Sequence, residues 1–342
     1  MRMLRVKYNK LFVTDNTKIA CIHRQIGRVI MELKGKKVMV VGTGISGIGA
    51  IDLLNKAGAD CIIYDANEKL TEEAVAKKLN GNKAQIIIGE LADDITEKVE
   101  LLVISPGVPV DSPLVKKFEE AGVPVWGEIE LAYNYDKGRI IAITGTNGKT
   151  TTTALVGQIV KAYNEQTYVV GNIGNSYTGE VLKTSENSYT VAEISSFQLE
   201  TVHRFHPVVS AILNITPDHL NRHHTMECYA HTKERIAENQ TKDDVCVLNM
   251  EDEELYRFGR ECKASVVWFS SKRKPDKGAY LDGDDIRYTD GTQDKLMLNI
   301  HDMNLLGTHN YENVCAAIAM TKAVGIPDDI IIEQVKCFKA VE

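Results

Sequence analysis

The sequence predicts an α/β fold in which two α/β domains follow one another along the chain, the first built on a parallel sheet. Short apolar runs alternate with amphipathic helical stretches, which is typical of parallel sheets covered by helices on both faces. A glycine-containing turn follows the first apolar run of each half, after Val41 and after Thr144. The length of 342 residues suits about two domains of ordinary size.

The first half is expected to form a domain over residues 31–137. The β-branched run at 38–41 predicts its first strand, and residues 45–57 have helical spacing that stops at Gly58. Residues 136–138 are a plausible linker. The other strands of this domain are predicted from short apolar runs at 61–64, 85–88, 101–104 and 123–126.

The same pattern restarts at residue 139, and we expect a second domain over residues 138–342. Residues 139–143 predict its first strand, and residues 150–163 predict the helix that follows. Two more helices are predicted at 311–324 and 328–338. The remaining strands are predicted at 168–170, 189–194, 208–215, 245–248, 265–269, 286–288 and 296–300.

Composition and charge exclude several classes of protein. With 44% hydrophobic and 25% charged residues, the chain has the composition of a globular protein. Its formal net charge of −7 argues against a nucleic-acid partner and against binding to an anionic membrane. No apolar run approaches the length of a membrane span. The seven cysteines are scattered and never spaced CxxC, which indicates reduced thiols in a cytoplasmic protein.

Residues 1–30 differ from the rest, because they contain seven Lys or Arg against one Asp and show no clear period. A targeting peptide would be basic and acid-poor in this way, but the apolar core and cleavage site of a secretory signal are missing. We therefore interpret this segment as an extension of unknown role, upstream of a domain that starts at Met31.

The run "ITGTNGKTTT" places a glycine-rich turn, residues 145–148, between a predicted strand and a predicted helix. In such a turn backbone N–H groups converge on an anion, and the helix dipole adds partial positive charge. Lys149 can contact terminal phosphates and the hydroxyl of Thr150 can bind Mg²⁺, so the stretch predicts a P-loop-like site for a nucleoside triphosphate. The strict GxxxxGK[ST] spacing is not met, because Ile143 stands where the first glycine would be. The alternative is a glycine turn that only caps a helix.

The run "VGTGISGIGA" places Gly42, Gly44 and Gly47 in the pattern GxGxxG, and Asp65 ends the next predicted strand. This context is typical of a Rossmann-like fold and, taken alone, indicates an NAD-dependent oxidoreductase. The same geometry serves any diphosphate-bearing ligand, and a second phosphate loop makes hydride transfer less economical. The turn "SPGVP" at 105–109 follows a later strand, where ligands bind in open sheets. Its alternative reading is an ordinary Pro-Gly turn.

Several polar residues stand at the ends of predicted strands in the second half. Glu193 interrupts an apolar strand, where its burial calls for a cation such as Mg²⁺. His219 lies at the mouth of another strand, and its alternative is a helix cap or a surface imidazole. His223 and His224 are expected in a solvated loop, and a zinc site is disfavoured because "HLNRH" lacks the glutamate of HExxH. Spacing alone indicates that Lys233 is a solvated helix lysine.

The segment "HNYEN" carries Asn310 and Asn313 at the start of a predicted helix. Asn310 could be an N-cap, and an asparagine three residues further on could instead contact the amide edge of a base. The residues alone leave this choice open.

Taken together and in this order, the motifs resemble those of the Mur ligases, the ATP-dependent amide-forming enzymes of peptidoglycan precursor synthesis. The matching segments are "TGTNGKTTT", "GNIG", "EISSFQLE", "NITPDHLNRH", the pair Tyr229 and Lys233, and "HNYEN". The segments "GTGISG", "SPGVP" and "GEIEL" look most like those of the members that add D-glutamate to UDP-N-acetylmuramoyl-L-alanine. The resemblance covers residues 31–342.

The resemblance implies a monomeric, cytoplasmic ligase of cell-wall synthesis that uses ATP and Mg²⁺. Its substrates would be UDP-N-acetylmuramoyl-L-alanine and D-glutamate. The carboxylate of the bound L-alanine would attack the γ-phosphate of ATP to give an acyl phosphate, and the incoming amine would then displace phosphate through a tetrahedral intermediate. Neither a nucleic-acid partner nor membrane insertion is expected.

The resemblance also implies roles for individual residues. The residues expected to bind ATP are Gly145, Thr146, Asn147, Gly148, Lys149, Thr150, Thr151, Asn310 and Asn313. The residues expected to bind the UDP-substrate are Gly44, Ile45, Ser46, Asp65, Ser105, Pro106, Gly107, Asn172 and Ser195. Those expected to take part in catalysis are Lys149, Glu193, His219 and Lys233, and those expected to bind metal are Thr150, Glu193, His219 and Lys233. Lys233 would be carbamylated, so that a cation becomes an anionic ligand.

The family carries a third, Rossmann-like domain that binds the incoming amino acid and closes on ATP. We expect this C-terminal domain to be absent from the chain, which stops at Glu342. Residues 1–342 should then bind the UDP-substrate, bind ATP weakly and turn over little, because the amine is not positioned. The alternatives are an NAD-dependent oxidoreductase and a non-catalytic UDP-sugar-binding fragment. The intact set of Lys149, Glu193, His219 and Lys233 speaks against a pure binding protein.

Overall fold

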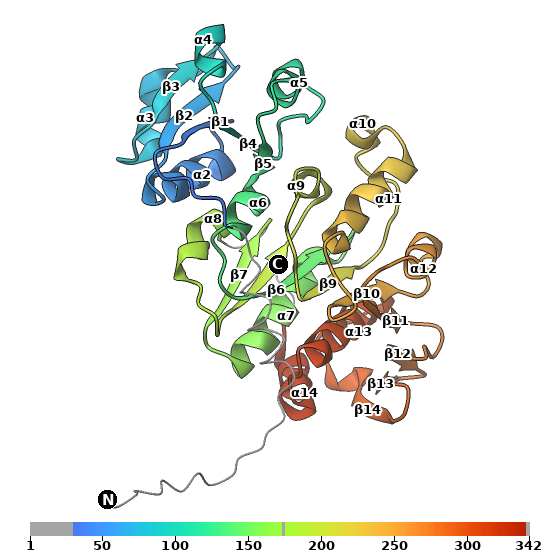
Figure 1. Ribbon diagram of the computed structural model, residues 1–342. Coiled ribbons are helices and arrows are strands. Elements are labelled where there is room, and N and C mark those ends of the chain that lie inside the picture. Colours follow the sequence, from blue (N-terminus) through green and yellow to red (C-terminus); the bar gives the residue numbers. More distant parts are fainter. Residues whose placement is uncertain (1–29, 173–174, 340–342) are drawn as a thin grey trace, which may run out of the picture. The chain divides into compact units, whose positions relative to one another are not determined.

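The computed structural model describes residues 30–172 and 175–339 (Figure 1). Contacts divide the chain into two units, residues 1–32 and residues 33–342, and all helices and strands below belong to the second unit. The extension predicted at residues 1–30 lies outside the described residues, apart from Ile30.

The first sheet has five parallel strands in the order β3-β2-β1-β4-β5. Its helices are formed by amphipathic stretches whose apolar side chains, among them Val115 and Phe118, pack on the sheet residues Met39, Ile62 and Leu102. The strands are β1 (Lys37–Val41), β2 (Asp60–Asp65), β3 (Gln85–Ile88), β4 (Leu101–Ile104) and β5 (Val125–Gly127). The helices are α2 (Ile45–Lys56), α3 (Glu72–Leu79), α4 (Asp93–Thr96), α5 (Pro113–Glu120) and α6 (Glu128–Tyr133).

The strand order of this sheet reverses between β1 and β4, which lie side by side. In open α/β sheets the turns that leave such a pair of strands bound a crevice in which ligands bind. The turn at Gly42 leaves β1 and the turn at Ser105 leaves β4, so the fold brings two segments with predicted binding residues together.

The second sheet has nine strands in the order β14-β13-β12-β11-β10-β9-β6-β8-β7. Strand β6, which precedes the phosphate loop, pairs with β8 on one side and β9 on the other. The strands are β6 (Arg139–Thr144), β7 (Thr167–Gly171), β8 (Tyr189–Glu193), β9 (Val209–Ile212), β10 (Val245–Asn249), β11 (Ser265–Ser270), β12 (Gly278–Asp282), β13 (Asp285–Thr289) and β14 (Asp294–Asn299).

The strands from β7 to β12 are parallel, whereas β13 and β14 are antiparallel additions at one edge. The second sheet is therefore mixed. Only Gly283 and Asp284 separate β12 from β13, and Gly283 has a φ of +60°. Two residues can close a hairpin but cannot form the long crossover that parallel neighbours need.

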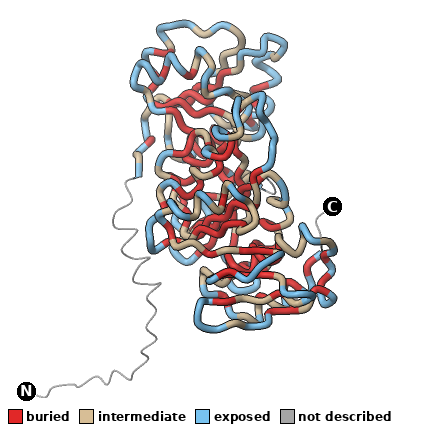
Figure 2. Tube along the Cα trace, turned by 90° about the vertical axis from the view of Figure 1, so that its right-hand side faces the viewer, coloured by how far each residue is buried: buried red, intermediate tan, exposed pale blue. Residues whose placement is uncertain are grey.

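Helices α7 (Lys149–Tyr163), α13 (Thr308–Ala323) and α14 (Asp328–Cys337) pack together against the second sheet (Figure 1). Residues 313–321 of α13 are buried without a break, because this helix lies between α7 and strands β10 to β12. Figure 2 shows that the buried residues run through the middle of the described chain and that the exposed ones lie at its outside. The shorter helices are α8 (Tyr177–Glu180), α9 (Ser196–Leu199), α10 (Leu220–His223), α11 (Met226–Glu234) and α12 (Glu253–Phe258), with 3₁₀ turns at Val181–Lys183, Arg235–Ala237 and Ile300–Asp302.

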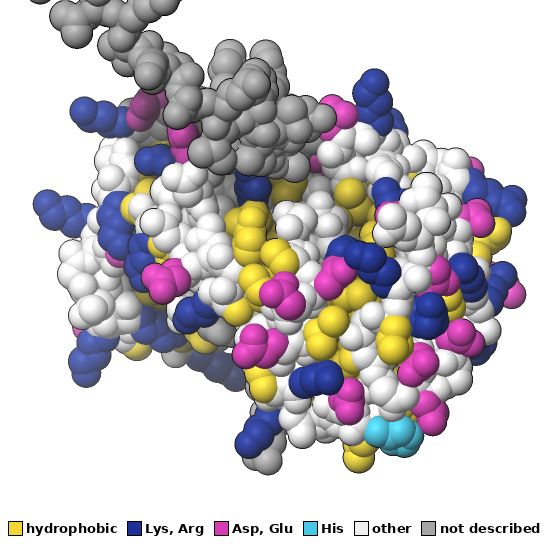
Figure 3. Space-filling view, turned by 90° about the horizontal axis from the view of Figure 1, so that it is seen from below, with side chains coloured by type: hydrophobic (Ala, Val, Ile, Leu, Met, Phe, Trp, Pro, Cys, Tyr) yellow, Lys and Arg dark blue, Asp and Glu magenta, His cyan; other side chains and the backbone are white. Residues whose placement is uncertain are grey.

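The surface agrees with the charge balance of the sequence. On the face seen in Figure 3, basic and acidic side chains are interspersed. Among the described residues, no helix is long and apolar enough to span a bilayer.

Candidate active site

The phosphate loop lies between β6 and α7, where the sequence predicts it. Gly148 is the N-cap of α7 with a φ of +81°, and Gly145 has a φ of +154°. The ammonium of Lys149 donates to the carbonyl oxygens of Gly145 at 2.9 Å and Thr146 at 2.8 Å, so this side chain folds back over the loop. Its burial lowers the pKa of Lys149, and the charge of Glu193 opposes this shift.

Asn214, which follows β9, braces the phosphate loop. Its backbone carbonyl accepts from the N–H of Thr146 at 2.9 Å, and its Oδ1 accepts from the N–H of Asn147 at 2.8 Å. Its Nδ2 donates to the carbonyl of Asn147 at 3.1 Å. Asn214 is not among the residues predicted from the sequence, although it opens the motif "NITPDH" directly after an apolar run. The loop is therefore held in place by a neighbouring strand end.

Lys233 of α11 is buried, which contradicts its interpretation as a solvated helix lysine. Its Nζ donates to the carbonyl of Gly145 at 2.8 Å and lies 4.6 Å from the ring centroid of Tyr229. Burial and the nearby charge of Lys149 lower the pKa of Lys233 to about 7. Tyr229 is itself anchored to the loop, with its hydroxyl 3.1 Å from Oγ1 of Thr146. Two lysines thus share one backbone acceptor in the phosphate loop.

Glu193 is the last residue of β8 and is buried beside the loop, since it pairs with Ile143 of β6. Its Oε1 accepts from Nδ2 of Asn172 at 2.8 Å. Its Oε2 is buried and has no hydrogen-bond partner among the residues that the structure describes. An unpartnered buried carboxylate oxygen facing a phosphate loop is a suitable ligand for a cation.

The chemistry of these groups fits Mg²⁺. The carboxylate of Glu193 and the hydroxyl of Thr150, in the first turn of α7, are the hard oxygen donors that this ion prefers. Within the described ranges no three His, Cys, Asp or Glu side chains cluster as metal ligands. Mg²⁺ commonly takes most of its ligands from waters and substrate phosphates, so a site with few protein ligands suits it.

His219 is exposed and is the N-cap of α10, with a φ of +50° that is uncommon outside glycine. Its ring centroid lies 4.9 Å from that of Phe197, and its Nε2 lies 3.4 Å from Oδ2 of Asp218. The charge of Asp218 raises the pKa of Lys149 and of Lys233 and so opposes the effect of burial. Asp218 is not among the residues predicted from the sequence, and only its position next to His219 could have indicated it.

His223 is buried, so its prediction as a solvated loop residue is wrong. Its Nε2 lies 3.0 Å from the hydroxyl of Ser196, and its Nδ1 lies 3.6 Å from Oε1 of Glu200. Burial lowers the pKa of His223. It is therefore part of the packing beneath α9, whereas His224 is exposed as predicted.

A cavity of about 330 Å³ opens beside the phosphate loop. Asn313 of α13 is buried at its wall, and its Oδ1 would lie only 2.3 Å from a Cβ added to Gly148. Asn310 does not line the cavity and donates to the carbonyl of Leu306 at 2.8 Å. The N-cap of α13 is Gly307, so the alternative reading of Asn310 as an N-cap is wrong. The lining residues are Asn147, Gly148, Leu213, Asn214, Phe269, His309, Glu312 and Asn313.

The predicted substrate residues of the first sheet gather around its two central turns. Gly42 has a φ of +102°, and a Cβ there would lie 2.7 Å from Oγ of Ser105, so the turns after β1 and β4 touch. The Ser105 hydroxyl is buried without a hydrogen-bond partner in the described part of the chain. Oδ2 of Asp65 accepts from the backbone N–H and hydroxyl of Thr43, at 3.1 and 2.8 Å.

Gly44, Ile45 and Ser46 form the start of α2 at this crevice, and Pro106 and Gly107 continue the turn after Ser105. Ile45, the first residue of α2, is 86% exposed. An unpartnered hydroxyl beside a helix N-terminus fits a diphosphate-bearing ligand.

Two other predicted substrate residues lie at the end of β8. Asn172 contacts Glu193 through its side chain and through its backbone N–H, which donates to the Glu193 carbonyl at 3.0 Å. The hydroxyl of Ser195 is engaged in a capping box with Gln198, which makes it a helix cap. Residues 173 and 174 of the "GNIG" motif lie outside the described residues. Thr151, a predicted ATP ligand, is half-buried in the first turn of α7.

Two family models match the chain over the regions that form this site. The model of the Mur ligase middle domain matches residues 143–321, and that of the Mur ligase MurD-like N-terminal domain matches residues 36–127. The chain belongs to the Mur ligase family. It is 78% identical over 312 residues to the UDP-N-acetylmuramoylalanine–D-glutamate ligase of Lachnospira eligens and 50% identical over 313 residues to that of Lachnoclostridium phytofermentans. Each match covers 91% of this chain and 69% of the relative.

Solved structures of Mur ligases and related enzymes share the fold. UDP-N-acetylmuramate:L-alanyl-gamma-D-glutamyl-meso-diaminopimelate ligase of Neisseria meningitides superposes with a TM-score of 0.61 at 18% identity, covering 90% of this chain and 99% of that one. A pseudomurein peptide ligase type C of Methanothermus fervidus gives 0.51 at 19% identity, covering 90% and 71%. The predicted α/β fold, with an N-terminal sheet followed by a Mur ligase middle domain, is confirmed.

Proposed function

We propose that this Mur ligase chain joins D-glutamate to UDP-N-acetylmuramoyl-L-alanine at the expense of ATP. The observation that carries the proposal is the unpartnered Oε2 of Glu193 beside a phosphate loop that holds two lysines. Residues with this arrangement suit transfer of a phosphoryl group to a carboxylate. The 78% identity to a UDP-N-acetylmuramoylalanine–D-glutamate ligase supports this choice of substrates.

The phosphate loop would hold the ATP phosphates. The first N–H groups of a helix have no acceptor within it, so the start of α7 can donate to phosphate oxygens. Lys149 would exchange its two carbonyl acceptors for phosphate oxygens and stabilise the charge that develops as the substrate carboxylate attacks. The adenosine would occupy the cavity walled by Asn313.

Glu193 and Thr150 would hold Mg²⁺, which when bound neutralises phosphate charge and favours nucleophilic attack at the γ-phosphate. Asn172 orients Glu193 by bonding its other carboxylate oxygen. His219 and Lys233 would contribute to a second metal site. With a pKa of about 7, Lys233 is partly neutral at physiological pH, so its amine can add to CO₂ and release a proton to give an anionic carbamate.

The UDP-substrate would lie across the turns after β1 and β4. Gly44 to Ser46 and Ser105 to Gly107 would contact the diphosphate and sugar, and Asp65 would contact the uridine. Domain limits of 31–137 and 138–342 are supported by the gap between α6 and β6. We further infer a monomeric enzyme that works in the cytoplasm, on the basis of its scattered thiols and mixed surface charge.

The test is phosphate release from radiolabelled ATP with UDP-N-acetylmuramoyl-L-alanine and D-glutamate present, under single-turnover conditions, together with calorimetric titration of each ligand. The proposal predicts binding of UDP-N-acetylmuramoyl-L-alanine and of MgATP, and release that depends on the UDP-substrate. Tight binding of NADH that UDP-N-acetylmuramoyl-L-alanine does not displace would support the oxidoreductase alternative instead. Binding of the UDP-substrate without binding of ATP would support the alternative of a non-catalytic fragment.

A further inference from the structure

The segment "GEIEL", residues 127–131, has no role in the function proposed above. It ends β5 and begins α6, and its two glutamates are buried, with Glu130 fully covered and Glu128 6% exposed. A buried carboxylate is unfavourable unless it is hydrogen-bonded. The partners of these two glutamates therefore indicate what the segment does.

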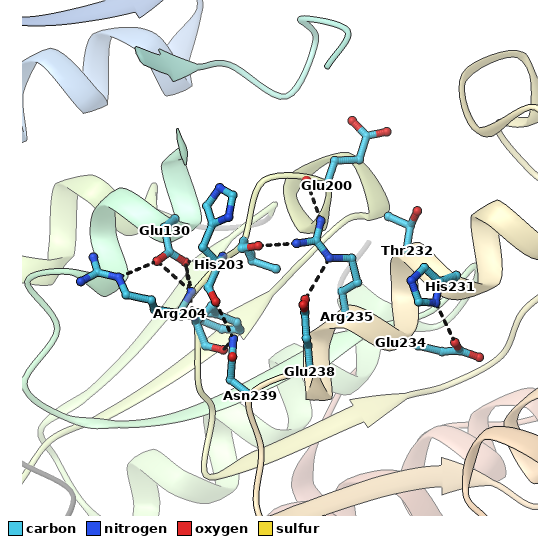
Figure 4. Close-up of polar contacts among 12 residues, drawn as sticks. Glu130, Glu200, His203, Arg204, His231, Thr232, Glu234, Arg235, Glu238 and Asn239 are labelled. Atoms are coloured by element: carbon cyan, nitrogen blue, oxygen red, sulfur yellow. Dashed lines mark hydrogen bonds and ion pairs between the residues drawn. The ribbon is translucent and has the colours of Figure 1, made fainter. Parts of the chain in front are cut away.

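Glu130 binds the backbone of a segment that is distant in sequence. Its carboxylate accepts from the N–H groups of His203 at 3.0 Å, Arg204 at 3.0 and 3.1 Å, and Phe205 at 3.1 Å (Figure 4). Nε of Arg204 adds a bond of 3.3 Å. Three consecutive peptide N–H groups directed at one carboxylate fix α6 to this segment, which precedes β9 of the second sheet.

The opposite edge of the same segment is bonded to the region that follows α11. Arg235 donates to the carbonyls of Glu200, at 2.6 Å, and Val202. Asn239 donates to the carbonyls at both ends of the turn 203–205, at 3.0 and 3.1 Å (Figure 4). Arg235 comes two residues after Lys233. The segment thus lies between α6 of the first sheet and the chain that carries Lys233.

Glu128 extends this connection toward Glu193. It accepts from Nε2 of Gln198, whose Oε1 accepts from the backbone N–H of Ser195 at 2.8 Å and its hydroxyl at 2.9 Å. Ser195 follows Glu193 by two residues at the end of β8. A continuous series of hydrogen bonds therefore runs from α6 to Ser195, two residues along the chain from the glutamate that offers the unpartnered carboxylate oxygen.

We propose that Glu128 and Glu130 are positioning residues of the ligase. By holding residues 195–205, which we call the brace, they fix Glu193 and Lys233 against the first sheet. The proposal rests on the proposed function, in which a carboxylate bound at the first sheet must meet a phosphate bound at the second. Reactions of this kind are sensitive to misplacement, because an error of about 1 Å can slow them about 100-fold.

The pair Glu128 and Gln198 allows a test by exchange of partners. Gln198→Glu removes the donor and places two carboxylates face to face, so it should release the brace. Glu128→Gln alone keeps an acceptor and serves as the matched control. The double variant Glu128→Gln/Gln198→Glu restores one donor and one acceptor with the roles reversed. Glu128→Ala, which removes the acceptor without adding a charge, is the second variant in case Gln198→Glu does not fold.

Single-turnover phosphate release and thermal unfolding are measured for each variant. We expect Gln198→Glu to lower the maximal rate at least about tenfold. The half-saturating concentration of the UDP-substrate should stay within about twofold, because the turns after β1 and β4 are not altered. The double variant should recover the rate to within about threefold of the wild type. An undiminished rate in Gln198→Glu and Glu128→Ala would overturn the proposal. So would a double variant that regains thermal stability but not rate.

Failure of the proposed function looks different. If the wild type releases no phosphate when the UDP-substrate and D-glutamate are both added, the proposed ligase function is contradicted. The affinity of each variant for MgATP in the presence of UDP-N-acetylmuramoyl-L-alanine then decides the role of the brace. Weaker affinity in Gln198→Glu that the double variant restores supports positioning, and equal affinity in all variants contradicts it.

Discussion

Two buried or half-buried lysines that share one carbonyl are the most unusual feature of the site at the scale of single residues. Both Lys149 and Lys233 donate to the carbonyl of Gly145, and burial lowers the pKa of each. Burying a lysine disfavours its charged form, so the folded chain holds Lys233 partly neutral near pH 7. This state is suited to a reaction with CO₂ and unfavourable for stability.

Lys233 predicts a pH dependence of stability. Below pH 7 the lysine is protonated in both the folded and the unfolded chain, so the burial of its charge lowers the stability of the fold by its full amount. Between a folded pKa of about 7 and an unfolded value of 10.5, the unfolded chain binds the extra proton, so this contribution to stability improves as pH rises. Lys233→Met should remove that slope and should stabilise the protein more at pH 6 than at pH 9. Urea unfolding in bicarbonate-free buffer measures it.

Lys161 provides the control for this prediction. It is an exposed lysine of α7, and Lys161→Met should leave the slope of the wild type unchanged. Equal pH slopes in the wild type and Lys233→Met would contradict the assignment of this titration to Lys233.

The backbone conformation of Gly148 and its contact with Asn313 predict that a substitution at this position weakens nucleotide binding. Gly148 and Gly325 both have a φ of +81°, but only Gly148 lies against a neighbour, with Oδ1 of Asn313 at 2.3 Å from an added Cβ. Both Gly→Ala changes should lower the free energy of unfolding by about 1 kcal/mol or more through backbone strain. Gly148→Ala should lose more and should also weaken ATP binding, because Asn313 must move. Equal effects of the two changes on stability and ATP affinity would refute the contact.

At the scale of elements, the ends of β6, β8 and β9 build the site. Strand β8 supplies Glu193, and Asn214 after β9 holds the loop after β6 by three hydrogen bonds. Loop positions are thus set by neighbouring strands, which is typical of sites on parallel sheets.

The bonds between Asn214 and the phosphate loop predict that a substitution of Asn214 selectively lowers the affinity for ATP. Asn214→Asp removes the donor to Asn147 and adds a negative charge beside the phosphate loop. Asn55 is the matched control, because it makes the same pair of bonds with the backbone of Lys83, at 2.7 and 2.8 Å, in the first sheet. Both changes to Asp should lower the free energy of unfolding by about 1–3 kcal/mol.

Only Asn214→Asp should weaken MgATP binding, by at least about tenfold, because charges a few ångströms apart interact strongly at a partly buried site. Titration calorimetry of the two variants measures this difference. If the Asn214→Asp protein binds MgATP as well as the Asn55→Asp protein does, ATP binding does not depend on the bonds from Asn214 to the phosphate loop.

Most elements could be predicted from apolar periodicity, but some could not. The strands at 85–88 and 101–104 have the predicted bounds, because each is a short run of branched apolar residues. Strand β12 was not predicted, since "GAYLD" begins with glycine and ends in aspartate. The burial of Lys233 could not be predicted either, because α11 is polar overall and its buried face is set by contact with a distant loop.

At the scale of the whole chain, each of the two sheets has a glycine turn after its first strand. In the proposed reaction one turn binds the UDP-substrate and the other binds ATP. This arrangement could be predicted, because both glycine motifs follow the first strand of their sheet. The bonds between Glu130 and residues 203–205 could not, because they join segments more than seventy residues apart that share no local pattern. Contacts of this range emerge only from the folded arrangement of both sheets.

The most direct measurement is a crystal structure of the chain with UDP-N-acetylmuramoyl-L-alanine, magnesium and a non-hydrolysable ATP analogue. We expect the triphosphate on Lys149 and Thr150, the metal against Oε2 of Glu193, and the uridine diphosphate at the turns after β1 and β4. An ATP analogue bound at the glycine turn after β1, or a phosphate loop left empty at saturating ligand, would contradict it.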